Sequence, residues 1–234
     1  RIIVHSEINK RQLKEVFRIK DEKISVIAYG VLNFYKKGEI AKEEARKELN
    51  LDNRDKVILY FGNIRRYKGV DILIRAFAKV RQEISNSKLI IAGKNWIDWQ
   101  PFQELIDKHG LNKDIILRLN YISTPEIPYY FSACDLVVLP YSHFESQSGP
   151  GNVALAFGKA MVVSNVGGLS DLVKNKDVIV PPCDDDRLAK AIIKVLKDDD
   201  FREKLENNSK ELAQKYSWDK IAKRTIELYK EITR

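Results

Sequence analysis

The sequence predicts an α/β fold, in which a doubly wound parallel sheet is followed by C-terminal helices. Short apolar segments recur along the chain, and we expect each to form a strand: residues 57–61, 89–92, 115–119, 136–139, 161–164 and 178–180. The segment 136–139 has no polar face, which is typical of a strand buried on both sides. Segments with helical spacing lie between these strands, and strands that alternate with helices form parallel sheets.

Smaller elements are expected before the first of these strands. Ser6 is a suitable N-cap for a helix, because its hydroxyl can accept a hydrogen bond from the first turn. The expected elements are strands at 2–4 and 24–28, a helix from Ser6 through Phe17, a loop at 32–38 and a charged helix from Glu39 to Leu49.

Helix signals follow the strands of the sheet. The helix from Val70 has apolar residues at helical spacing, namely Leu73, Phe77, Val80 and Ile84. Pro101 suits the first turn of the next helix, and Thr124-Pro125-Glu126 suits the capped start of the helix before Cys134. After the strand at 136–139 comes a polar loop, and then a buried helix at 153–157 that Gly158 ends.

The C-terminal part is expected to be helical. Asp184-Asp185-Asp186 supplies negative charge at a helix start. A second helix is expected from about Asp199 to Tyr216. Ser217 would cap a last helix, whose broad apolar face runs from Trp218 to Ile232.

Composition limits the class of protein. The chain has 234 residues, of which 44% are hydrophobic, so a globular core is expected. The net charge of +8 comes with many acidic residues, which suits an anionic ligand or a lipid surface better than a nucleic-acid arm. A solvated charged surface is the alternative. Cys134 and Cys183 show no metal-ligand spacing, so reduced thiols and a cytoplasmic location are expected.

No targeting or membrane-spanning segment is expected. No apolar stretch approaches the ~20 residues that span a bilayer, and no signal peptide is visible. The sequence starts with Arg1, and its only methionine is Met161. We therefore expect a piece of a longer protein or a processed one.

Two loops carry the candidate chemistry. In the first, Gly62 lets the backbone turn after a strand, and Arg65, Arg66 and Lys68 precede a helix. Fixed cations at a helix start suit a diphosphate, although a solvated basic turn is the alternative. The second loop ends in Ser148-Gly149-Pro150-Gly151 before a helix, where free N–H groups suit an anion. The alternative for this loop is a tight turn that needs glycine. Pro150 counts against an anion site, because it lacks an N–H.

Both loops follow the carboxyl ends of expected strands, and such loops face the ligand crevice of an open α/β sheet. We therefore expect them to converge on one ligand. Neither loop is a Walker loop or a G-x-G-x-x-G fingerprint.

Four segments in order resemble family 4 retaining glycosyltransferases. Residues 61–71 resemble the family's "G…KG(V/L)D" segment, and residues 88–93 its next strand. Residues 130–141 resemble the strand before the donor loop. Residues 158–169 resemble the usual "GKPVVATxVGGL". The resemblance covers roughly residues 57–233.

The resemblance implies the two-domain GT-B fold, in which a Rossmann-like C-terminal domain binds the nucleotide-sugar. Residues 1–56 would be the end of the N-terminal domain and the linker. Residues 57–216 would be the donor-binding domain, and residues 217–234 a helix that crosses back. Most of the acceptor-binding domain would be missing.

The resemblance also implies roles for single residues. Lys68 and an arginine would hold the diphosphate, with Gly62 shaping the turn. Many members place that arginine directly after the glycine, where this sequence has Asn63, so Arg65 is the better candidate.

The family's donor loop usually carries a Glu, seven residues and a second Glu. The first position falls on Glu145, which would be the catalytic carboxylate that orients donor-sugar hydroxyls. An exposed loop carboxylate is the alternative. The second falls on Val153, which cannot hydrogen-bond a ribose, and Asn152 is the candidate substitute. The donor contacts expected in this loop are Ser148, Gly149, Gly151 and Asn152.

These roles imply the donor-binding part of a retaining glycosyltransferase that transfers a hexose from a nucleotide diphosphate sugar to an acceptor hydroxyl. No metal or other cofactor is expected. The expected partners are the donor, a carbohydrate or lipid-linked acceptor and the N-terminal domain, with peripheral membrane contact but no nucleic acid. The alternatives are a non-catalytic nucleotide-sugar-binding module and a GT-B sugar epimerase. The chain by itself is expected to be inactive.

Overall fold

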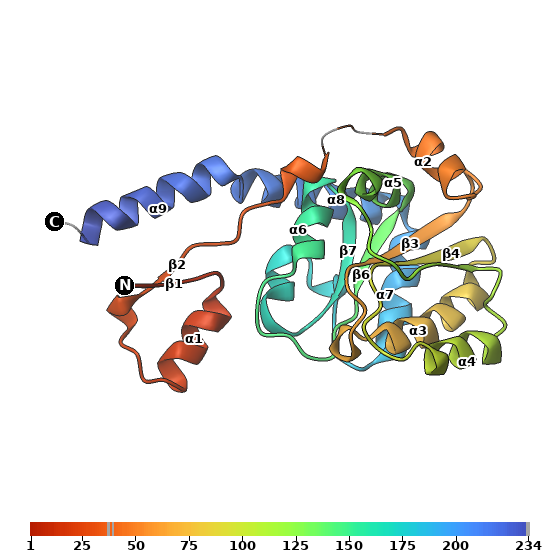
Figure 1. Cartoon of the computed structure of the whole chain (residues 1–234), viewed down its shortest axis with the longest axis horizontal. Coiled ribbons are helices and arrows are strands. Elements are labelled where there is room, and N and C mark those ends of the chain that lie inside the picture. Colours follow the sequence, from red (N-terminus) through yellow and green to blue (C-terminus); the bar gives the residue numbers. More distant parts are fainter. Residues whose placement is uncertain (37, 39, 233–234) are drawn as a thin grey trace.

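The main body of the protein is a six-stranded parallel sheet with the strand order β5-β4-β3-β6-β7-β8 (Figure 1). The computed structural model describes residues 1–36, 38 and 40–232. The strands of this sheet are β3 (Lys56–Phe61), β4 (Ser87–Ala92), β5 (Ile115–Arg118), β6 (Leu136–Leu139), β7 (Ala160–Ser164) and β8 (Ile179–Val180). Each apolar segment expected to be a strand is one, and the doubly wound parallel sheet is confirmed.

Helices cover both faces of the sheet, which explains why its strands are apolar throughout. In β3, Ile58 and Tyr60 belong to the core on one face, and Val57 and Leu59 to the core on the other. The first face is covered by α3 (Val70–Glu83), α4 (Gln100–Lys108) and α7 (Asp185–Lys197). The second is covered by α2 (Lys42–Glu48), α5 (Ile127–Ala133), α6 (Gly149–Ala156) and part of α8 (Asp199–Lys215).

The N-terminal residues form a small unit of their own. β1 (Ile2–Val4) pairs in parallel with β2 (Ile24–Val26), and α1 (Glu7–Glu15) connects them. The hydroxyl of Ser6 accepts a hydrogen bond from the Asn9 amide at 3.1 Å, so Ser6 is the expected N-cap. In Figure 1 this unit and α9 (Trp218–Ile232) lie on the same side of the sheet body.

The linker from this unit to the sheet domain passes beside the start of α9. The amide of Val31 donates to the carbonyl of Tyr216 at 3.0 Å. A side chain at Gly30 would overlap the indole of Trp218, and that indole meets the ring of Tyr29 edge to face. The chain therefore enters and leaves the sheet domain at neighbouring points.

Local details differ from the expected elements. Part of the expected loop at 32–38 forms a 3-10 helix, Asn33–Lys36. Ser123 rather than Thr124 caps the turn before α5, because Glu126 accepts a hydrogen bond from the Ser123 amide at 2.9 Å. Glu39, where we expect a helix to begin, lies outside the described residues.

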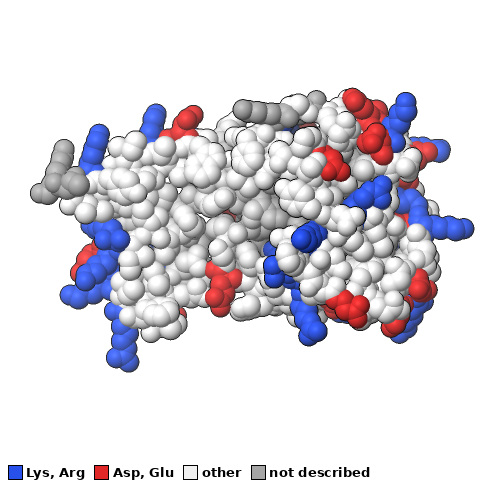
Figure 2. All heavy atoms as spheres, viewed as in Figure 1, with Lys and Arg blue, Asp and Glu red and all other residues white. Residues whose placement is uncertain are grey.

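Charged side chains are spread over the surface. Figure 2 shows Lys and Arg predominating at the end of the molecule that carries α1 and α9, with both signs mixed elsewhere on this face. In the described part of the chain, no helix combines the length and hydrophobicity needed to cross a bilayer.

Asp135 ties the start of β6 to its neighbours through buried charge. Its carboxylate accepts hydrogen bonds from the Val57 amide at 2.7 Å, from Arg46 at 2.9 Å and from Lys42 at 2.6 Å. Arg46 is also buried and donates to the carbonyl of Ala133 at 3.1 Å. Burial raises the pKa of Asp135, but Lys42, the Val57 amide and Arg46 outweigh it and hold that pKa below its usual range. One carboxylate thus joins β3, β6, α2 and the end of α5.

Replacing Asp135 by alanine should lower the free energy of unfolding by about 3–5 kcal/mol, because Arg46 would stay buried without its partner. Urea unfolding measures the change. Glu83→Ala is the control, since it breaks a 2.8 Å pair with Lys197 whose side chains are 58% and 51% exposed. Because this pair is exposed, Glu83→Ala should leave the urea midpoint nearly unchanged. Equal losses would contradict the role assigned to Asp135.

Candidate functional site

The candidate site lies at the point where the winding of the sheet reverses. β3 and β6 are neighbours, but the chain leaves β3 toward β4 on one side and β6 toward β7 on the other. The loops after both strands therefore open onto one crevice. They also touch, since the amide and hydroxyl of Ser142 donate to the carbonyl of Tyr67 at 2.8 and 3.2 Å. Gly62, Arg65, Lys68 and residues 148–152 are thus brought to the same edge of the sheet.

Lys68 is a buried cation in a box of aromatic rings. It is 7% exposed, and its ammonium lies 3.7 Å from the ring centroid of Tyr141, 4.9 Å from Phe144 and 5.1 Å from Tyr67. Burial, and then the nearby charge of Arg65, lowers the pKa of Lys68 to about 7. Among the described residues no carboxylate pairs with it. A buried ammonium without a counter-charge is costly, so the box suits an anionic ligand.

Two further cationic side chains lie close to the ring of Trp96 at the mouth of the crevice. The guanidinium of Arg65 lies 5.1 Å, and the ammonium of Lys94 4.2 Å, from its ring centroid. The indole N–H of Trp96 donates to the side-chain oxygen of Asn63 at 3.3 Å. Sequence reasoning missed Lys94 and Trp96. The signal was their position directly after β4, whose carboxyl end lies beside that of β3.

The start of α6 offers a ligand fewer free backbone N–H groups than its sequence suggests. Residues 149–151, expected as loop, form the first turn of the helix, because the Ser148 hydroxyl accepts a hydrogen bond from the Gly151 amide at 3.2 Å. Ser148 is buried, and its hydroxyl also contacts the phenol of Tyr141 at 3.1 Å. The Asn152 amide donates to the Ser148 carbonyl, and Pro150 has no N–H. In the described structure this leaves the Gly149 N–H for a ligand.

Glu145 lies on the exposed part of the loop after β6. Its side chain is 67% exposed, and its Oε1 is 3.5 Å from Nε2 of His143. The same loop touches the N-terminal unit, where Asn9 donates to the Glu145 carbonyl at 2.6 Å and Gln147 donates to the His5 carbonyl at 3.3 Å. Over the described residues, no three His, Cys, Asp or Glu side chains are grouped so that they could hold a metal ion.

Asn152 faces a different cavity from Val153. It is buried and donates from Nδ2 to the Ser148 carbonyl at 3.0 Å. Its side chain lines a small cavity together with His5 and Asp171. Val153 instead lines a larger pocket on the crevice side.

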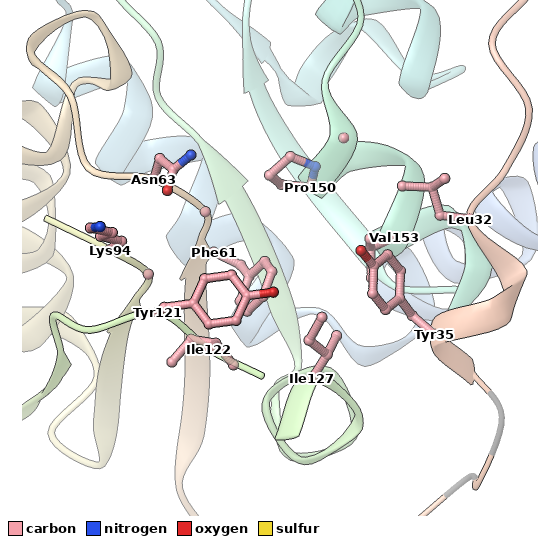
Figure 3. A pocket seen from close by; sticks show the side chains of 13 residues that line it. Leu32, Tyr35, Phe61, Asn63, Lys94, Tyr121, Ile122, Ile127, Pro150 and Val153 are labelled. Carbon is pink, nitrogen blue, oxygen red and sulfur yellow. The ribbon is translucent and has the colours of Figure 1, made fainter. Parts of the chain in front are cut away.

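That larger pocket has a volume of about 240 Å³ (Figure 3). Its apolar lining consists of Leu32, Phe61, Ile122, Ile127, Pro150 and Val153, and its polar side chains are Tyr35, Asn63, Lys94 and Tyr121. Figure 3 shows Asn63 and Lys94 at one end of the pocket, and Leu32, Tyr35 and Val153 at the other. Apolar walls with a few polar groups are typical of small-molecule sites.

Two glycines allow the crevice loops to approach closely. Gly62 has a φ of +120°, and a methyl group there would lie 2.8 Å from Cγ of Pro150. Gly69 has a φ of +66°, and a methyl group there would overlap the carbonyl oxygen of Pro140. Glycine is the residue that tolerates both the conformation and the contact.

Comparison with known proteins shows the family of this chain. Residues 41–212 match the family model for glycosyl transferases group 1. The chain belongs to this family. An uncharacterised glycosyltransferase of Methanocaldococcus jannaschii is 31% identical over 98% of this chain and 59% of its own length. The lipopolysaccharide 1,2-N-acetylglucosaminetransferase of Salmonella typhimurium is 26% identical over 98% of this chain and 62% of its own length.

Solved structures of similar proteins share the fold. The sucrose-phosphate synthase of Thermosynechococcus elongatus has a TM-score of 0.82 at 26% identity and covers 99% of this chain, which spans 58% of that protein. HepE of Anabaena, solved with UDP and glucose, has a TM-score of 0.81 at 22% identity over 98% of this chain and 62% of HepE. The Rossmann-like fold, as found in GT-B glycosyltransferases, is confirmed. The chain spans about three-fifths of the proteins that it matches.

Replacing Gly69 by alanine should destabilise the protein more than replacing Gly110, although both have a φ of +66°. The backbone cost of about 1–2 kcal/mol is common to both variants. Only at Gly69 does the new methyl group overlap another atom, since nothing lies within 4 Å at Gly110. We expect an additional loss of about 1–3 kcal/mol for Gly69→Ala in urea unfolding. If Gly69→Ala and Gly110→Ala lose the same free energy of unfolding, the crevice loops can move apart at Gly69 without cost.

Proposed function

We propose that this chain is the donor-binding part of a retaining glycosyltransferase of the two-domain GT-B type. The reaction is the transfer of a hexose from a nucleotide diphosphate sugar to an acceptor hydroxyl. The observation that carries the proposal is the buried ammonium of Lys68, which lies between the two crevice loops near Arg65 and pairs with no carboxylate of the described residues. Membership of the group 1 family supports the reaction class.

The diphosphate is proposed to bind between the two crevice loops. Lys68 and Arg65 supply positive charge, and the Gly149 N–H supplies a donor at the start of α6. A bound diphosphate would offset the cost of burying the Lys68 ammonium and hold it in its charged form.

The nucleoside is proposed to occupy the 240 Å³ pocket. The pocket is lined by Gly62 and Gly149 of the two crevice loops, so a nucleoside there would stay within reach of a diphosphate at Lys68. Its apolar walls suit the faces of a base. Tyr121 is 74% exposed at the pocket and is assigned to stack on that base.

Catalysis would follow from electrostatics at the leaving group. Negative charge builds up on the diphosphate as its bond to the sugar breaks, and fixed cations stabilise that charge in the transition state. Lys68 and Arg65 are assigned this role. Glu145, which is exposed on the loop after β6, is assigned to orient the hydroxyls of the donor sugar.

The acceptor site is proposed to lie largely outside this chain, in an N-terminal domain. Ile2, Ile3, Trp218, Ile226 and Ile232 are between 36% and 52% exposed on the β1–α1–β2 unit and α9, and are assigned to contact that domain. Residues 1–56 would then be its end and the linker, residues 57–216 the donor-binding domain, and residues 217–234 the crossing helix. The basic side chains around α1 and α9 support a cytoplasmic enzyme in peripheral contact with an anionic membrane that carries a lipid-linked acceptor (Figure 2).

Replacing Lys68 or Arg65 by alanine should weaken nucleotide diphosphate binding roughly tenfold or more, since a charge-assisted contact contributes ~1.5–3 kcal/mol. Calorimetric titration with UDP, GDP and ADP measures the affinities. Lys113→Ala is the control, because it removes one positive charge before β5, at the opposite edge of the sheet. It should change affinity by less than about twofold. Unchanged affinity in both crevice variants would reject the assignment.

Binding of a nucleotide-sugar should weaken as the pH rises above 7. Unliganded Lys68 has a pKa of about 7, and a bound diphosphate would raise that pKa, so binding above pH 7 takes up a proton. Affinity should be constant well below this pKa and fall by up to about tenfold per pH unit above it, until the bound-state pKa is reached.

The measurement is calorimetric titration from pH 6 to 9 with a nucleotide-sugar, which lacks the terminal phosphate that titrates near pH 6. Lys68→Arg keeps its charge over this range and should give a flat profile. A native profile as flat as that of Lys68→Arg would contradict the assignment.

The chain by itself should bind a nucleotide-sugar and transfer nothing. Orientation of the reactants can lower a barrier by ~7–11 kcal/mol, and domain closure normally provides it. The experiment compares turnover of this chain and of the full-length protein with a panel of nucleotide-sugars. Comparable turnover by the chain would show that the site is complete within it. Binding without transfer by the full-length protein would favour a non-catalytic module, as Val153 in place of a carboxylate suggests.

A further inference from the structure

The side of the pocket next to α6 is largely apolar. Leu32, Ile127, Pro150 and Val153 line it with hydrocarbon, and Tyr35 adds an aromatic ring with a hydroxyl. In Figure 3 the ring of Tyr35 stands beside Val153, with its hydroxyl oxygen directed away from its own backbone and into the space lined by these residues. Nothing in the described part of the chain hydrogen-bonds that hydroxyl.

A nucleoside in this pocket brings two ribose hydroxyls to the same side. The ribose is bonded to the diphosphate, and the diphosphate is proposed to accept from the Gly149 N–H, so the ribose would lie at the side of the pocket lined by Gly149. Val153 follows Gly149 by one turn of α6 and faces the same pocket. A buried ribose hydroxyl needs a hydrogen-bond partner, and the side chain of Val153 offers none.

We propose that Tyr35 hydrogen-bonds the ribose of the bound nucleotide and so selects ribose over deoxyribose. This proposal rests on the nucleotide diphosphate function proposed above. Tyr35 belongs to the 3-10 helix Asn33–Lys36, in the segment that links the β1–α1–β2 unit to the sheet domain. The bound nucleotide-sugar would therefore contact the linker as well as the crevice loops.

The test compares Tyr35→Phe with the native chain. Titrations use UDP, GDP and ADP, and then the 2′-deoxy and 3′-deoxy forms of the tightest binder. Tyr35→Phe should bind the ribonucleotide about three- to tenfold more weakly, the range of one hydrogen bond. For the deoxy form that lacks the contacted hydroxyl, native chain and variant should bind equally. The native chain should also prefer the ribonucleotide to that form by a similar factor.

Tyr129→Phe on α5 is the matched control, because Tyr129 lies outside the pocket and should leave every affinity unchanged. Equal thermal unfolding midpoints in the native chain and both variants would show that the fold is intact. An unchanged ribonucleotide affinity in Tyr35→Phe, or an equal loss for the ribonucleotide and both deoxy forms, would overturn the proposal. A native chain that binds none of the nucleotides would overturn the proposed function with it.

Discussion

The parallel pairing of β3 with β6 is the constraint on which the site depends. Because these neighbours point the same way, their two loops must meet at one edge of the sheet. The pair is held at both ends. At the amino ends the Asp135 carboxylate bonds the Val57 amide, and at the carboxyl ends Gly69 lies against the Pro140 carbonyl. A charged hydrogen bond thus holds the amino ends of β3 and β6 together, and a close backbone contact holds the loops at their carboxyl ends.

Two buried charges of the domain, those of Asp135 and Lys68, are used in opposite ways. Asp135 is neutralised within the fold by Arg46 and Lys42, so its attraction contributes to stability. Within the described part of the chain, the Lys68 ammonium faces the rings of Tyr67, Tyr141 and Phe144, which offset part of the cost of burying its charge. A carboxylate beside Lys68 would lower the cost further, but it would also repel an anionic ligand. The aromatic box therefore keeps the cation available.

The sheet could be predicted because its strands are buried on both faces and read as uninterrupted apolar segments. Arg65 and Lys68 could be placed at the crevice because they follow β3 directly in sequence. The aromatic box could not, since Tyr141 and Phe144 come from the other loop and meet Lys68 through side-chain packing. Tyr35 was missed for a similar reason, because nothing in a short segment expected to be a loop shows which pocket it reaches.

The neighbouring chain crossings at Val31 and Tyr216 limit how the β1–α1–β2 unit can turn against the sheet domain. The linker at Val31 is hydrogen-bonded to the Tyr216 carbonyl just before α9, so the unit is anchored to the sheet domain at that point by more than the continuity of the chain. Contact between Gly30 and the Trp218 indole leaves little room for sliding. The unit is held on the crevice side as well, where Asn9 donates to the Glu145 carbonyl and Gln147 donates to the His5 carbonyl, so any turning of the unit would have to break these two hydrogen bonds.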